Sequence, residues 1–101
     1  ELSDISEILF MPEIENSRGN RWLTTLLFHK TNPIKVIEAL EKESIESRPL
    51  WKPMHIQPLF KGSKSFVDGT SEDMFDRGIC LPSPTASQDE LYRVVEVIKQ
   101  I

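Results

Sequence analysis

The side chains best suited to bind a ligand lie in one proline-rich segment, from Arg48 to Phe60. Arg48 offers a planar guanidinium that can clamp a carboxylate or a phosphate through parallel N–H bonds. Trp51 can stack on a ring or pack against a sugar, and His55 can donate to a diphosphate or a hydroxyl. These are the groups that an anionic, ring-containing ligand requires, so Arg48, Trp51 and His55 are the candidate substrate-binding residues.

The same segment also has a purely structural interpretation. Trp51, Met54 and Phe60 can pack as a small satellite core while Arg48 and Lys52 remain solvated. Residue types alone do not establish a ligand site. On the residues alone we favour the structural interpretation, and the ligand site stays open as the alternative.

The rest of the sequence carries few chemical signatures. It has no glycine-rich phosphate loop, no nucleophile elbow and no pair of histidines at metal-ligand spacing. Cys80 is the only cysteine and lies between Ile79 and Leu81, where we expect a buried structural thiol. The residues therefore indicate neither a catalytic motif nor a metal site within this chain.

Composition limits the classes of partner. With 101 residues and 39% hydrophobic side chains, the chain should form one domain, residues 1–101. The net charge of -4 repels nucleic acid, and no apolar run reaches the roughly 20 residues that span a membrane. One cysteine fits a reducing compartment, so we expect the cytoplasm. The chain begins at Glu1 instead of Met, and we expect it to be a piece of a longer protein.

Short strands and amphipathic helices must position the Arg48–Phe60 segment. Asn32 followed by Pro33 predicts a helix start, and Ser87 with Glu90 forms a capping box that predicts another. The predicted strands are residues 7–11, 21–28, 45–50 and 79–81, and the predicted helices are 33–44, 71–78 and 87–101, with a helix tail at 2–6. So few strands make one small sheet, and a two-layer α+β sandwich with helices on the sheet follows. The strand order stays open.

Two connecting segments have their own signals. Prolines 49, 53 and 58 remove three backbone donors, which predicts a rigid, extended loop beyond Leu50. Residues 61–69 contain two glycines and several small polar residues, which predicts a flexible excursion. Ser71 is the expected cap of the helix that Gly78 ends.

Several motifs together resemble a known family. They are Asn20-Arg-Trp-Leu-Thr-Thr25, Ile45-Glu-Ser-Arg-Pro-Leu-Trp-Lys-Pro-Met-His55, Gln57-Pro58 and Gly78-Ile-Cys-Leu-Pro-Ser83, followed by an amphipathic helix. In this order they resemble the C-terminal domain of sugar aminotransferases of the DegT and StrS type. The match is nearest to the branch that acts on UDP-linked sugars. Pro84 after Ser83 departs from the small residue common in relatives.

The resemblance implies a parent enzyme of fold-type I that uses pyridoxal phosphate. Such an enzyme transfers an amino group from glutamate to a nucleotide-linked keto sugar, in amino-sugar or surface-polysaccharide biosynthesis, and usually works as a homodimer. The family's large domain holds the cofactor and its lysine, so the resemblance implies that this chain alone is inactive and that Lys52 is not the Schiff-base residue. It also implies that this chain binds no cofactor and holds no catalytic residue. By the same resemblance, His55 contacts the nucleotide sugar or lies in the vicinity of the cofactor, and Trp51 and Arg48 line or buttress that edge. The alternative is a stand-alone, non-enzymatic α+β module that binds a small molecule or a protein.

Overall fold

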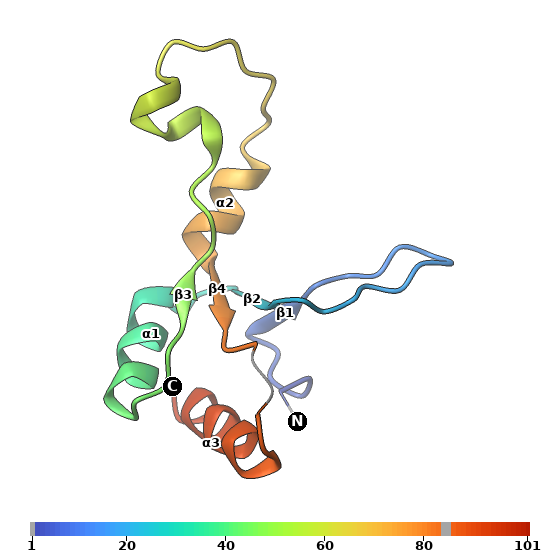
Figure 1. Ribbon diagram of the computed structural model, residues 1–101, viewed down its shortest axis with the longest axis vertical. Coiled ribbons are helices and arrows are strands. Elements are labelled where there is room, and N and C mark those ends of the chain that lie inside the picture. Colours follow the sequence, from blue (N-terminus) through green and yellow to red (C-terminus); the bar gives the residue numbers. More distant parts are fainter. Residues whose placement is uncertain (1, 84–85) are drawn as a thin grey trace.

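The computed structural model describes residues 2–83 and 86–101. Within them it contains one four-stranded sheet, three α-helices and two short 3-10 turns (Figure 1). In chain order the elements are β1 (Ile8–Phe10), β2 (Thr24–Phe28), α1 (Pro33–Lys42), β3 (Arg48–Pro49), the 3-10 turns η1 (Met54–Ile56) and η2 (Pro58–Phe60), α2 (Thr70–Arg77), β4 (Gly78–Leu81) and α3 (Gln88–Lys99).

The sheet has the strand order β1-β2-β4-β3, and each neighbouring pair is antiparallel. Leu26 pairs with Ile79, and both side chains are completely buried. Because side chains alternate between the two faces of a strand, Thr25 and its partner Cys80 point to the opposite face. The expected two-layer α+β arrangement of a small sheet packed by helices is confirmed.

The core joins the sheet to α1 and α3. Val36 and Leu40 of α1 are completely buried, and Ile98 is the buried residue of α3. The full cluster consists of Leu2, Ile8, Leu26, Phe28, Val36, Leu40, Ile45, Ile79, Leu81 and Ile98. Two of the three predicted helix caps are confirmed: Asn32 Oδ1 accepts from the Ile34 amide at 3.0 Å, and Ser87 and Glu90 form the reciprocal capping box.

Three local predictions were wrong. Residues 2–6 form hydrogen-bonded turns instead of a helix tail. The segment beyond Leu50 is not uniformly extended, because the backbone folds into η1 and η2 around its prolines. Ser71 lies inside α2, and the helix is instead preceded by Gly69, with Asp68 accepting a bond from the Thr70 amide.

Other predictions hold in part. The strand predicted at 45–50 is paired only at Arg48 and Pro49. Of the amphipathic helix predicted at 87–101, α3 ends at Lys99; Leu91 within it and Ile101 beyond it remain about half exposed. Pro84, the departure from the family pattern, lies outside the described residues.

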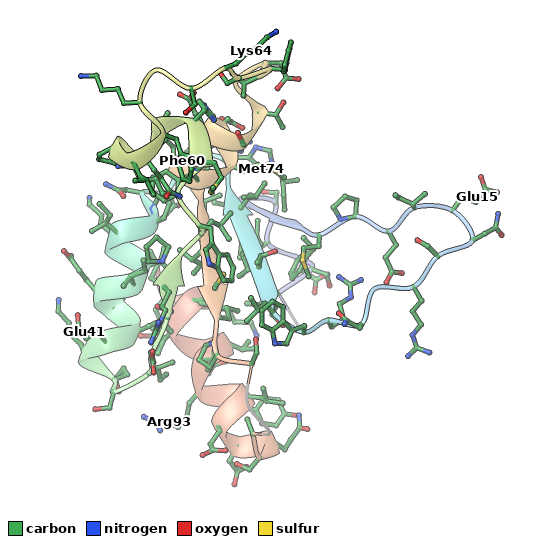
Figure 2. The ribbon with its side chains drawn as sticks, turned by 45° about the horizontal axis from the view of Figure 1, so that its top comes forward. Glu15, Glu41, Phe60, Lys64, Met74 and Arg93 are labelled. Atoms are coloured by element: carbon green, nitrogen blue, oxygen red, sulfur yellow. The ribbon has the colours of Figure 1, made fainter. Side chains whose placement is uncertain are left out.

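Two excursions leave the sheet. Residues 11–23 form an arm between β1 and β2, and residues 50–77 form a longer excursion between β3 and β4; Glu15 and Lys64 lie near their far ends (Figure 2). The Cα radius of gyration is 15.2 Å, above the value of about 13 Å for a compact 100-residue domain. The two excursions therefore expand the molecule beyond its core.

Candidate functional site

The long excursion, residues 50–77, carries the candidate residue His55 in η1. An ideal Cβ placed on Gly78 would lie 2.7 Å from both Leu50 Cγ and the Met74 carbonyl oxygen. Only glycine lets the start of the excursion pass this close to the end of α2, because any larger side chain would overlap these atoms. The excursion is thus closed at its base by a tight contact between Leu50 and Gly78.

His55 is hydrogen-bonded to a carboxylate within the excursion. Its Nε2 atom lies 2.6 Å from Oε1 of Glu72, and its side chain is only 15% exposed. The turn around it is closed locally, since the Gln57 side-chain amide donates to the Lys52 carbonyl at 2.8 Å. His55 is therefore partly buried and oriented before any ligand arrives.

Helix α2, which supplies Glu72, is itself tied to the sheet. Arg77 donates to the Phe28 carbonyl at 3.2 Å and forms a two-point ion pair with Asp73 one turn earlier. Hydrogen bonding by this guanidinium lowers the pKa of the Asp73 carboxyl. A continuous series of contacts thus links His55 through Glu72 and α2 to strand β2.

Arg48 and Trp51 lie in a different environment from His55. The Arg48 guanidinium donates through Nε to Glu46 Oε1 at 2.8 Å, and its side chain is 77% exposed. Trp51 is 68% exposed. Neither side chain belongs to the buried core, so the satellite-core interpretation of Trp51 does not describe this structure.

Both residues line a broad apolar concavity between the sheet and α3. Its volume is about 1200 Å³, and its lining also includes Trp22 and Leu91. This volume exceeds the range of roughly 300–1,000 Å³ typical of small-molecule pockets. His55 is absent from the lining, so the structure brings Arg48 and Trp51 together and leaves His55 apart from them, in η1 of the excursion.

Cys80 behaves as a structural residue. Its side chain is buried in β4, and burial raises the pKa of the thiol, which disfavours the reactive thiolate. Residues 2–83 and 86–101 contain no cluster of three or more side chains arranged to hold a metal ion. In the same ranges no helix has the length and apolar character required to cross a membrane.

Sequence reasoning missed Glu72 and Arg77. A carboxylate in the first turn of a short helix and an arginine in its last turn are ordinary responses to the helix dipole. Nothing in the spacing of 17 residues between His55 and Glu72 marks them as partners. Only the path of the excursion brings the two side chains together.

Comparison with known proteins gives two informative matches, although no family model matches the chain. The chain is 44% identical over 103 aligned residues to the "Putative pyridoxal phosphate-dependent aminotransferase EpsN" of Bacillus subtilis. This alignment covers 96% of this chain and 26% of that protein. It is 30% identical over 104 aligned residues to the "Uncharacterized protein MJ1066" of Methanocaldococcus jannaschii, covering 94% of this chain and 27% of that protein. The chain therefore spans about a quarter of the length of these relatives and is related to a protein named as an aminotransferase.

Proposed function

We propose that this chain, residues 1–101, is the C-terminal small domain of a pyridoxal-phosphate-dependent sugar aminotransferase. The parent would transfer an amino group from glutamate to a nucleotide-linked keto sugar in amino-sugar or surface-polysaccharide biosynthesis. The 44% identity to the Bacillus subtilis protein, extending over 96% of the chain, is the observation that carries the proposal. The DegT and StrS resemblance of the segment from Arg48 to Pro58 supplies the substrate class.

None of the chain's lysines lies in the enclosed environment that a lysine bound to pyridoxal phosphate requires. Pyridoxal phosphate supplies the electron sink for amino transfer and is held through a lysine amine in an enclosed site. All seven lysines of the chain fall among the described residues, and each is exposed. The proposal therefore assigns cofactor binding to a part of the parent outside this chain.

In this proposal the chain lends substrate contacts. The exposed Arg48 guanidinium can exchange Glu46 for a ligand phosphate or carboxylate, because an ion pair between two largely exposed side chains contributes little. Trp51 presents an exposed indole that can cover a ring. His55 is preoriented by Glu72 and adds one polar contact.

The apolar concavity also fits a domain of a larger enzyme. Trp22 is 73% exposed and shares the concavity with the exposed Trp51. Exposed apolar surface on this scale marks an interaction site, and the relatives are about four times as long as this chain. We propose that the concavity packs against the remainder of the parent polypeptide.

Reading the complete open reading frame and assaying its product tests the proposal. The full-length protein should bind pyridoxal phosphate and transfer an amino group from glutamate to a UDP-linked keto sugar. This chain mixed with the cofactor should show no aldimine absorbance, and borohydride should trap no specific lysine adduct. A full-length protein without amino transfer, or a specific adduct on this chain, would contradict the proposal.

Replacing His55 tests whether this residue contacts the substrate. His55→Ala in the full-length protein should weaken amino transfer or binding of the nucleotide sugar while the cofactor absorbance stays unchanged. The matched control is His29→Ala, which changes the chain's other histidine at the end of β2. Unchanged steady-state kinetics in His55→Ala would remove His55 from the site.

A further inference from the structure

A carboxylate from a separate element holds the ring of His55. The 2.6 Å separation between His55 Nε2 and Glu72 Oε1 lies at the short end of protein hydrogen bonds, as charge-assisted bonds do. His55 comes from η1 and Glu72 from α2. An ionised carboxylate has no proton to donate, so the proton of this bond resides on Nε2.

This bond determines what the other ring nitrogen can do. A neutral imidazole has one N–H and one lone pair, and the hydrogen bond at one nitrogen fixes the role of the other. In the neutral ring, with Nε2–H donated to Glu72, the Nδ1 atom of His55 is an acceptor. A ligand group that meets the neutral ring must then be a donor, such as a hydroxyl or an amine, and a diphosphate oxygen fits only the protonated ring.

Both sides of the pair are constrained by further contacts. Glu72 lies in the first turn of α2, where a carboxylate interacts favourably with the helix dipole. Arg77 ties the same helix to the Phe28 carbonyl, and Gln57 closes the turn that carries His55. A group whose support is fixed loses less freedom when a ligand binds, which is the basis of preorganisation.

We propose that Glu72 is a positioning residue for His55: it holds the imidazole through Nε2 so that Nδ1 faces the ligand as a hydrogen-bond acceptor. The assignment of a sugar hydroxyl or amine as the matching group rests on the proposed function. Glu72 itself makes no contact with substrate in this proposal. Its effect on the reaction passes entirely through His55.

The first test uses this chain and needs no substrate. Nitrogen-15 NMR of the histidine rings, at a pH high enough for the rings to be neutral, should show the His55 proton on Nε2 and protected from solvent exchange. Glu72→Ala should lose this protected proton, whereas Glu72→Gln, which keeps an acceptor oxygen, should retain part of the protection. Asp76→Ala removes an exposed carboxylate from the same helix and is the matched control, expected to match the unmodified chain.

Three NMR outcomes would overturn the positioning role. One is a neutral ring protonated on Nδ1 in the unmodified chain, and another is an absence of any protected ring proton. The third is retention of the protected proton in Glu72→Ala. None of these outcomes bears on whether the parent transfers amino groups.

The second test uses the full-length protein. Because hydrogen bonds to charged groups are worth about ten- to a hundredfold in an equilibrium, Glu72→Ala should reduce kcat/KM for the nucleotide sugar roughly tenfold. The double variant Glu72→Ala/His55→Ala should be no worse than His55→Ala alone, because Glu72 acts only through His55. If the double variant loses kcat/KM by the product of the two single losses, the proposal is overturned. A parent without any amino transfer would instead remove the proposed function and leave the NMR result intact.

Discussion

Replacing Gly78 with alanine should destabilise the chain, because Gly78 closes the base of the excursion that carries His55. The added methyl would approach both Leu50 Cγ and the Met74 carbonyl oxygen at 2.7 Å, closer than carbon atoms of real side chains come to such neighbours. Leu50 can rotate away, but the Met74 oxygen belongs to the backbone of α2. The substitution therefore forces the end of α2 to shift.

The expected cost follows from two opposing terms. Overpacking a tight contact costs about 1–3 kcal/mol. Gly78 has φ of -113°, which alanine adopts without strain, so the reduced freedom of the unfolded chain returns about 0.4–1 kcal/mol. The net loss is about 1–2 kcal/mol, which lowers the midpoint of thermal unfolding by roughly 5–15 °C for a domain of this size.

Thermal unfolding followed by circular dichroism measures this loss, with Gly19→Ala as the matched control. An ideal Cβ on Gly19 meets no atom nearer than 3.7 Å, so the control should stay within about 0.5 kcal/mol of the unmodified chain. Combining Gly78→Ala with Leu50→Ala should cost less than the sum of the two, because the truncated Leu50 no longer meets the new methyl. Equal unfolding midpoints for Gly78→Ala and Gly19→Ala would refute the close-packing explanation.

Three further predictions concern charge, thiol reactivity and the apolar concavity. Backbone hydrogen bonds from Lys30 and Thr31 lower the pKa of the Glu7 carboxyl. The contribution of Glu7 to folding stability is therefore present above the ordinary pKa of 4.5 and is lost as the pH falls through the lowered pKa. Urea unfolding from pH 7 to pH 3 should therefore show a smaller loss of stability in Glu7→Gln than in the unmodified chain, and equal losses would contradict this. The buried Cys80 thiol, whose pKa is raised, should react with iodoacetamide far more slowly in the folded chain than in urea, and similar rates would contradict its burial. The isolated chain should self-associate with rising concentration in sedimentation experiments, and Trp22→Ser should reduce this association; a concentration-independent monomer would count against an exposed docking surface.

Local signals predicted the helices well because each signal acts within a few residues. Asn32 followed by Pro33 predicted the start of α1, and Ser87 with Glu90 predicted the start of α3. The start of α2 was misassigned, because Ser71 looks like a cap in sequence while Asp68 makes the hydrogen bond in the structure. Two nearby polar residues compete for this role, and backbone geometry decides between them.

Long-range features could not be predicted in the same way. The sheet order β1-β2-β4-β3 places β4 between strands that precede it in the chain, and short strands carry no signal for that choice. The prolines predicted a rigid, extended loop beyond Leu50. This was wrong where the backbone folds into the two 3-10 turns, which depend on how the ends of the segment are tied.

Some residues of the candidate site can be recognised from their type, whereas the contact that orients His55 is known only from the packing of the chain. Arg48, Trp51 and His55 stand out because a guanidinium, an indole and an imidazole share one proline-rich segment. Glu72 does not stand out, yet its bond to Nε2 leaves the neutral ring of His55 with an acceptor at Nδ1, in place of the donor to a diphosphate or hydroxyl expected from the sequence. The chemistry assigned to a histidine from sequence is therefore incomplete until the partner of one ring nitrogen is known, and here that partner reverses the direction of the expected hydrogen bond.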